Sequence, residues 1–193
     1  MRKWQYVGLF TAIAIATAAS VPIAGGVANA QQDTASQGEA AAAVPNASHG
    51  KAKEAANKRV VLAFMKDVLD GHRGDHAVRY LTPGMSWHSG TVGTVTGREN
   101  VAGLMSTVVT SIPDLKTEVK DIFADGDKVV VRLVVTGTQK GPLLGIPATG
   151  RRVQWDAIDL YHLKGGKISE EWAGEDFVAF LNSTGTYKAP WIP

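Results

Sequence analysis

The chain has 193 residues and no cysteine, and 20 Lys and Arg side chains stand against 18 Asp and Glu side chains. The lack of cysteine excludes disulfides, thiolate nucleophiles and cysteine-ligated metal sites. Arg2 and Lys3 account for the whole excess of two positive charges, so the remainder is neutral and lacks the basic excess of a nucleic-acid-binding protein. We therefore expect no nucleic-acid partner.

The first thirty residues, "MRKWQYVGLFTAIAIATAASVPIAGGVANA", have the composition of a secretory signal peptide. A basic start precedes an apolar run over 7–19, and Ala28 and Ala30 form an A-x-A cleavage pattern. The alternative is a membrane anchor, but Thr, Ser and Pro interrupt the ~20 apolar residues that an anchor needs. We predict a signal peptide at 1–30, export to the periplasm or the medium, and no membrane attachment after its removal.

Residues 31–56 are rich in Ala, Gln, Ser and Gly and contain no aromatic side chain. Such a segment buries too little apolar surface to offset the entropy of ordering it. We predict a flexible linker at 31–56, with some helical tendency near Lys51. Residues 57–193 are long enough for one domain with a single core.

The first half of this domain has mainly helical periodicity. A helix is predicted over 57–72 with Gly71 as its stop signal, and a second, short helix over 75–83. Residues 84–90, "GMSWHSG", indicate a short strand. A third helix is predicted over 96–115.

The second half changes to the alternating pattern of strands. Residues 116–139 form two β-branched runs about "ADGD", a hairpin in which Gly126 takes positive φ. After a Gly- and Pro-rich connection, residues 151–173 indicate a second hairpin about Gly165 and Gly166, and a short helix closes the domain. Helices segregated from strands predict an α+β fold, in which the helices pack on one face of a curved antiparallel sheet.

Motifs for metal and phosphate chemistry are incomplete. His72 and His76 are four residues apart in "HRGDH", but Gly74 breaks the helix and the Glu of H-E-x-x-H is missing. The glycine-rich segments do not have the order of a P-loop, and the chain lacks a G-x-S-x-G elbow. We interpret "HRGDH" as a polar turn between helices.

The stretch "EEWAGEDF" concentrates acidic side chains near the end of the chain. In a strand, Glu170 and Glu171 point to opposite faces, and Trp172 shares a face with Glu170 and Ile168. Asp176 would then begin the last helix, where the helix dipole favours a carboxylate without any catalytic role.

Four short motifs occur along the domain: a proline-aspartate pair, a G-D-x-V-V-x-R strand, a G-x-P-x-T-G-R loop and a G-K-I-x-E-x-W strand followed by Asp. They lie at 113–114, 126–132, 145–151 and 166–172, with the final Asp at Asp176. In this combination the chain resembles the SnoaL-like polyketide cyclases, the ester cyclase branch of the nuclear transport factor 2 (NTF2) and ketosteroid isomerase superfamily. The resemblance implies an NTF2-like cone that encloses an apolar pocket, and a homodimer that pairs through the outer face of its sheet.

The resemblance also implies an activity. Asp176 corresponds to the general acid/base of an intramolecular aldol ring closure, which needs neither a metal nor another cofactor. The substrate would be a small apolar molecule with a carbonyl group. His162 replaces an Arg that is frequent in the family and is a second catalytic candidate, and Gln139 replaces a frequent His. The predicted substrate-binding residues are Trp87, His88, Gln139, Trp155 and Trp172.

Three functions remain open at this point. The first is an exported cyclase or isomerase, and the second is a non-catalytic carrier or sensor that binds a small ligand in the same cavity. The third is a dimerising module whose cavity is filled by its own side chains. The first requires Asp176 to face the cavity with a raised pKa, whereas a helix-end carboxylate that faces water favours the second.

Overall fold

The computed structural model describes residues 47–191. The predicted signal peptide and the linker as far as residue 46 lie outside this range. Helix α1 spans Ala47–Phe64, so it begins well before the predicted domain boundary at residue 57, and residues 47–56 are helical. Among the described residues, no helix combines the length and the apolar character needed to cross a membrane.

The helical part departs from the prediction in its details. The last turn of the first helix is a π-helix, η1 (Met65–Leu69), and the second predicted helix is a 3₁₀-helix, η2 (Gly74–Arg79). A side chain on Gly74 would overlap the backbone of Ser106, so η2 lies directly against helix α2 (Arg98–Ser111). His76 faces the Asp67 carboxylate at 3.1 Å, which makes "HRGDH" a polar turn as predicted.

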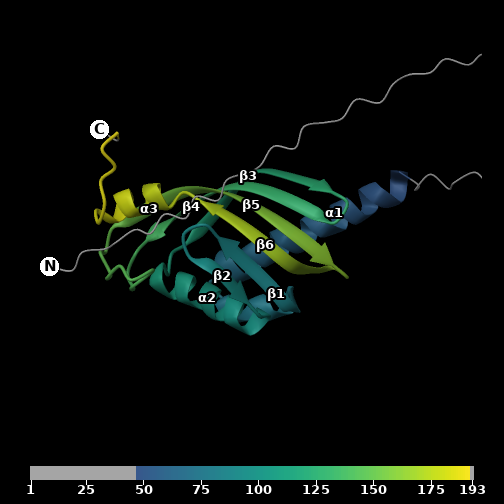
Figure 1. The fold of residues 1–193 in the computed structure, drawn as a ribbon, viewed down its shortest axis with the longest axis horizontal. Coiled ribbons are helices and arrows are strands. Elements are labelled where there is room, and N and C mark those ends of the chain that lie inside the picture. Colours follow the sequence, from purple (N-terminus) through teal and green to yellow (C-terminus); the bar gives the residue numbers. More distant parts are fainter. Residues whose placement is uncertain (1–46, 192–193) are drawn as a thin grey trace, which may run out of the picture. The chain divides into compact units, whose positions relative to one another are not determined.

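Six strands form one curved, open sheet in the order β2-β1-β6-β5-β4-β3. The strands are β1 (Leu81–Ser89), β2 (Gly93–Thr96), β3 (Lys116–Asp125), β4 (Lys128–Thr138), β5 (Arg152–Lys164) and β6 (Lys167–Glu175). All neighbours are antiparallel except β1 and β6, which are parallel. Figure 1 shows α2 beside β1 and β2, and the long strands β3 to β6 on the other side. The predicted α+β architecture is therefore correct.

The two predicted hairpins are present. Gly126 turns β3 into β4 with φ of 59°, and Gly165 and Gly166 turn β5 into β6 with φ of 59° and 74°. Positive φ is the conformation in which glycine has no steric cost. Strand β2 was not among the predicted elements, and it pairs with β1 from Ser86 to Ser89.

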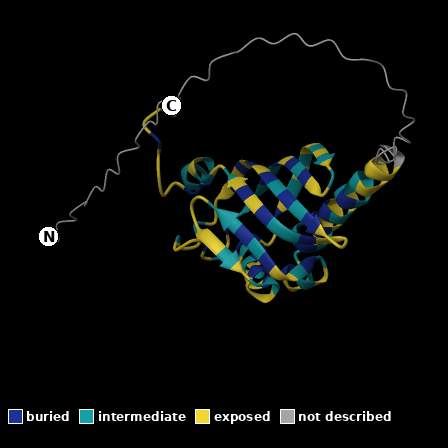
Figure 2. Ribbon diagram, turned by 45° about the vertical axis from the view of Figure 1, so that its right-hand side comes forward, coloured by how far each residue is buried: buried dark blue, intermediate teal, exposed yellow. Residues whose placement is uncertain are grey.

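The core lies between the inner face of the sheet and the helices. Inner and outer side chains alternate along β4 and β5, which Figure 2 shows as alternating buried and less buried residues. On β4, the buried residues Val129, Val131 and Leu133 point inward and join Val61 and Phe64 of α1 in one hydrophobic cluster. Burial of such side chains contributes roughly 1.5–3 kcal/mol each.

Helix α3 (Phe177–Thr184) follows β6 directly, and its N-cap is Asp176. Its Phe180 is buried against Trp155 of β5, with ring centroids 5.3 Å apart in an edge-to-face arrangement. Gly185 ends the helix in the left-handed conformation. The predicted terminal helix is thereby confirmed, and it covers the end of the sheet where β6 stops.

The tight contact between β4 and the end of α2 predicts a stability effect. A Cβ atom on the buried Gly137 would overlap Cγ2 of the fully buried Ile112 and lie 3.3 Å from Cα of Leu115. Gly137→Ala is therefore expected to lower the free energy of unfolding by about 1–3 kcal/mol in urea titrations. Gly103→Ala is the control, because that exposed helical position has open space and gains up to about 1 kcal/mol. Equal stability of the two variants would contradict the contact.

Candidate active site

A cavity opens between the inner face of the sheet and the helices. Its volume is about 90 Å³, enough for several water molecules or a small ring. Half-exposed Val92, after β1, and Leu144, in the connection between β4 and β5, also line it and mark its mouth. The other lining residues are mainly apolar or aromatic and include Phe64, Leu69, Trp87, Leu104, Met105, Val108, Trp155, Phe177 and Phe180.

Three carboxyl groups lie in the wall of this cavity: Asp159 on β5, and Glu171 and Glu175 on β6. Asp159 is directly opposite Ala173, and Glu171 and Glu175 precede and follow Ala173 on the same face of β6. Residues diagonally opposite across an antiparallel pair are about 7–8 Å apart, within reach of long side chains. Strand register alone therefore gathers the three acids, which we call the carboxyl cluster.

Few donors satisfy the carboxyl cluster. The Asp159 carboxylate accepts the backbone N–H of Gly174 at 3.3 Å and the Tyr161 hydroxyl at 3.4 Å. The indole N–H of Trp155 donates to Glu175 Oε2. Glu171 Oε2 is buried and has no hydrogen-bond partner. Buried carboxyls with so few donors favour their neutral form.

The pKa values in the cluster are raised accordingly. Burial raises the pKa of Glu171 to about 8, helped by the charge of Glu175 and opposed by the polar hydrogens of Trp87 and Tyr161. Burial raises the pKa of Glu175 to about 7, against the hydrogen bond from Trp155. Burial, and then the charges of Glu175 and Glu171, raise the pKa of Asp159 well above its usual range. Near neutral pH the cluster is thus only partly ionised.

A partly ionised cluster can both accept and donate a proton. An ionised carboxylate can remove an acidic C–H proton, while a neutral carboxylic acid beside it can donate a hydrogen bond to a carbonyl oxygen. The best pKa for such a group lies near the working pH, a condition that Glu175 and Glu171 meet at neutral pH.

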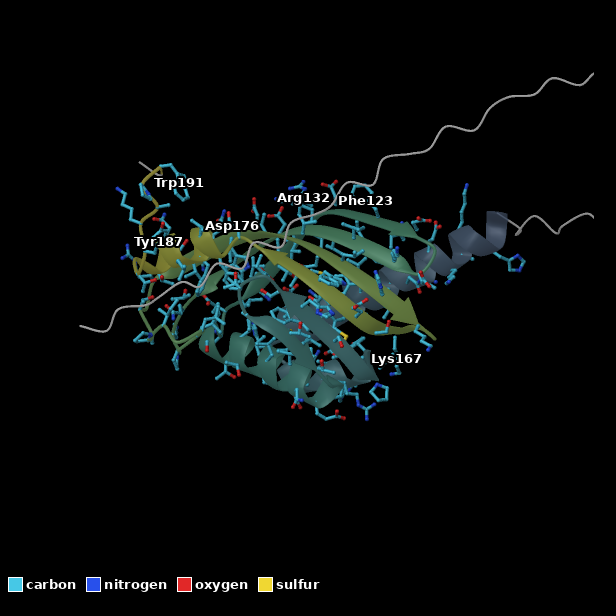
Figure 3. All side chains as sticks on the ribbon, viewed as in Figure 1. Phe123, Arg132, Lys167, Asp176, Tyr187 and Trp191 are labelled. Carbon is cyan, nitrogen blue, oxygen red and sulfur yellow. The ribbon has the colours of Figure 1, made fainter. Side chains whose placement is uncertain are left out.

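Asp176 is placed differently from the expectation. It is exposed at the junction of β6 and α3 (Figure 3), and it does not line the cavity. Its Oδ1 accepts the backbone N–H of Ala179 at 2.9 Å, and its own backbone N–H donates to the carbonyl oxygen of Asp156. Asp176 therefore does not face the cavity, as the catalytic role would require; it caps α3, as its place in the sequence alone would suggest.

His162, His88 and Trp172 lie on the outer face of the sheet, opposite the cavity. His162 Nδ1 is 2.9 Å from one oxygen of the Glu170 carboxylate, and His88 Nε2 is 3.1 Å from the other. The ring of His88 stacks on Trp172 with centroids 4.2 Å apart. The catalytic candidate His162 and the predicted substrate-binding residues His88 and Trp172 therefore do not line this cavity, because each has the outward parity of its strand. His88 and Trp172 line a hollow on the outer face instead.

Gln139 is fully buried, but its partners belong to the chain itself. Its side-chain amide donates to the carbonyl oxygens of Gly141, Ile146 and Pro147, and its Oε1 accepts the hydroxyl of Thr149. These bonds fix the connection that brings Leu144 to the mouth of the cavity. Gln139 thus stabilises the connection that forms part of the cavity wall, whereas it was expected to contact the substrate. Of the predicted binding residues, Trp87 and Trp155 do line the cavity.

Sequence reasoning missed all three members of the carboxyl cluster. A signal for Asp159 existed: it alternates with Ala157 and Tyr161 on the inward parity of β5. The parity of β6 was harder to read, because the pairing register shifts between Ile168 and Glu170. Ile168 and Glu171 consequently both point inward, although strict alternation places them on opposite faces.

Fold and cavity together define a small α+β protein with an acidic group inside an apolar pocket. Residues 59–183 match the sequence model of the SnoaL-like polyketide cyclase family, so the chain belongs to that family. Membership supports a cofactor-independent role of the cyclase or isomerase kind. A search of curated proteins gives no match.

Solved structures agree with this assignment. A protein from Jannaschia sp. CCS1, described as a SnoaL-like polyketide cyclase, is 25% identical with a TM-score of 0.62, covering 70% of this chain and 96% of that one. AclR from Streptomyces galilaeus, described as a hydroxylase, is 26% identical with a TM-score of 0.63, covering 72% and 90%. A protein with a ketosteroid isomerase-like fold from Catenulispora acidiphila is 19% identical with a TM-score of 0.57, covering 69% and 97%. The last likeness concerns the fold alone.

The raised pKa values predict how stability depends on pH. Glu171 and Glu175 bind protons more tightly when folded than their ordinary pKa of 4.5 allows, so their contribution is greatest below pH 4.5. As pH rises through about 7 and 8, that contribution is lost. In urea titrations, the free energy of unfolding should fall by more than about 1.4 kcal/mol, the equivalent of one pKa unit, between pH 4.5 and about pH 8. Glu171→Gln should flatten the profile, whereas Glu170→Gln on the outer face should not. A profile that is flat in the unmodified protein would contradict the burial of these acids.

Proposed function

We propose that the protein is a cofactor-independent cyclase or isomerase that acts on a small apolar carbonyl compound, with the carboxyl cluster as its acid and base. The observation that carries this proposal is the burial of ionisable carboxyls in an apolar, ligand-sized cavity. Family membership supports the reaction type. The catalytic acid/base is thus reassigned from Asp176 to the neighbouring Glu175 and to Glu171.

The chemistry divides between two side chains. Glu175 has a lower pKa than Glu171 and is the more ionised of the two at neutral pH, so it is the base. It takes the proton from the carbon beside the carbonyl group, the electron pair of that C–H bond forms a carbon–carbon double bond, and the π pair of the carbonyl group moves to its oxygen. Neutral Glu171 donates a hydrogen bond to this oxygen as negative charge develops.

The enolate can then react in either of two ways. In a cyclase, its carbon attacks a second carbonyl of the same molecule, and Glu175 returns the proton to the new alkoxide. In an isomerase, Glu175 returns the proton to a different carbon. Neither route consumes an oxidant, a reductant or a co-reactant. The apolar walls contributed by Trp87, Leu104 and Phe177 limit water in the cavity and keep the charge stabilisation strong.

A specific observation favours the carrier function as well. Asp176, the acid that the resemblance made catalytic, faces water as the cap of α3. A protein that had lost catalysis would retain the cavity and bind a small ligand without converting it. The carboxyl cluster supports the catalytic function over the carrier function, because a carrier of neutral apolar ligands has no use for three acids in its cavity wall.

The proposal is tested with acetophenone, a small apolar ketone. We expect the protein to catalyse deuterium exchange of its methyl protons in D₂O, measured by NMR. Glu175→Gln should reduce the catalysed exchange by about 10²- to 10⁴-fold, because it removes the base but keeps the shape. Asp176→Asn should leave the exchange unchanged. If Asp176→Asn abolishes exchange instead, the capping residue is the base; if acetophenone binds without exchange, the carrier function is correct.

We also propose that the protein forms a homodimer through the outer face of the sheet. Four apolar residues, Phe123, Val130, Leu160 and Trp172, are directly paired across β3 to β6 on that face. Phe123 and Trp172 are 62% and 50% exposed, and nearby Ile158 is 57% exposed. A row of this kind is unusual on a monomer surface.

Sedimentation equilibrium tests the dimer. The unmodified protein should sediment as a dimer, and Ile158→Glu should shift it to a monomer because a charge would be buried at the interface. Val178→Glu, at a half-exposed position on α3 away from this row, is the control and should leave the dimer intact. A monomeric unmodified protein at micromolar concentration would rule out the proposal.

A further inference from the structure

The acidic side chains in the cavity wall are not balanced by basic ones. Its wall contains three carboxyl groups, yet no Lys, Arg or His occurs among the described residues that line it. Full ionisation of the cluster would place three negative charges side by side in an apolar space, which is why their pKa values rise. The described lining residues supply no positive charge, so these acids are neutralised by binding protons.

Glu171 supplies a second, independent observation. It is 5% exposed, it lines the cavity, and its Oε2 has no hydrogen-bond partner. The Trp155 indole bonds Glu175 and the Tyr161 hydroxyl bonds Asp159. The polar hydrogens of Trp87 and Tyr161 lie close enough to lower the pKa of Glu171, but neither bonds its Oε2. A buried acceptor without a donor is destabilising, so a donor brought by the ligand would recover the free energy of the missing hydrogen bond.

The remaining walls suit a cation with an apolar body. Trp87, Trp155 and Phe177 line the same cavity, and the faces of aromatic rings attract organic cations as well as apolar groups. A metal ion does not fit these residues, since no group of three His, Asp or Glu side chains within residues 47–191 has metal-binding geometry. The volume of about 90 Å³ limits the ligand to approximately one ring.

We infer that the ligand of this cavity carries a protonated nitrogen, and that this organic ammonium group donates an N–H hydrogen bond to Glu171 Oε2 while its apolar body lies against the aromatic walls. This inference rests on the proposed function in that it names the class of substrate for the same site: a small carbonyl compound that also bears a basic nitrogen. For such a substrate Glu171 is ionised, so the neutral acid that donates to the carbonyl oxygen is Asp159, whose burial favours its protonated form. The ammonium group supplies the positive charge that the lining residues lack.

Binding of such a ligand must displace a proton. The groups that face Glu171 are Asp159 and Tyr161 from β5 and Glu175 from its own strand. The lining residues from α1, η1, α2 and α3 are uncharged, and β1 contributes the indole of Trp87. An ammonium group therefore ionises Glu171 at the expense of its proton, and its affinity rises with pH as fewer protons remain to be displaced.

Isothermal titration calorimetry with two probes of the same shape tests the inference. Benzylamine is protonated near neutral pH, whereas benzyl alcohol is neutral. We expect benzylamine to bind at least about tenfold more tightly than benzyl alcohol, the equivalent of one charge-assisted hydrogen bond. Its affinity should rise from pH 6 to pH 8, and titrations in two buffers of different ionisation enthalpy should show proton release.

Two matched variants test whether Glu171 supplies the negative charge that binds the ammonium group. Glu171→Gln keeps the size of the side chain and removes its charge, so the preference for benzylamine over benzyl alcohol should disappear. Glu170→Gln is the control, because it makes the same change on the adjacent residue of the same strand but on the outer face. It should leave the preference unchanged. Proton release measured on the unmodified protein tests the inference without any variant.

The outcomes separate this inference from the proposed function. If benzyl alcohol binds as tightly as benzylamine, if neither binds, or if benzylamine binds without releasing a proton, the inference is overturned. If it is overturned while acetophenone exchange is still catalysed, the proposed function stands alone. If benzylamine binds as expected and acetophenone is not exchanged, the cavity is a site for organic amines without the proposed catalysis.

Discussion

Burial of ionisable groups on the inner face of β5 and β6 is the constraint that gives this cavity its chemistry. Apolar side chains from the helices and from the curved sheet surround Asp159, Glu171 and Glu175 and leave them few donors. The cost of removing these groups from water appears as raised pKa values and as a preference for the protonated state. The same cost poises the cluster for proton transfer near neutral pH. Burial of these acids thus lowers the stability of the fold at neutral pH and gives the acids pKa values suited to proton transfer.

The two faces of the sheet have different chemistry, although residues of both faces alternate along the sequence. Adjacent residues of β6 take opposite faces: Glu171 lies in the cavity, whereas Glu170 holds His88 and His162 on the outside. The inner surface is an apolar pocket with acids, and the outer surface is an apolar row with a polar histidine cluster. A change of one residue in register would exchange these roles.

Much of the architecture could be predicted from the sequence because its signals are local. Gly126, Gly165 and Gly166 mark hairpins through the φ values they must adopt, and β-branched alternation identifies β4 and β5. The start of α1 and the 3₁₀ form of η2 were not predictable, since these depend on packing against distant segments. The signal peptide stays a prediction, because residues 1–30 lie outside the described part of the chain.

The sequence by itself determined the α+β fold, the family and the acidic stretch at the end of the last strand. Only the tertiary structure decided which acid faces the cavity. The reason is physical: a register shift after Ile168 reverses the parity of β6, so that Glu171 and Glu175 turn inward, and Asp176 falls beyond the strand as the cap of α3. Side chains of adjacent strand residues point to opposite faces of the sheet, and long-range strand pairing decides which of them faces the cavity.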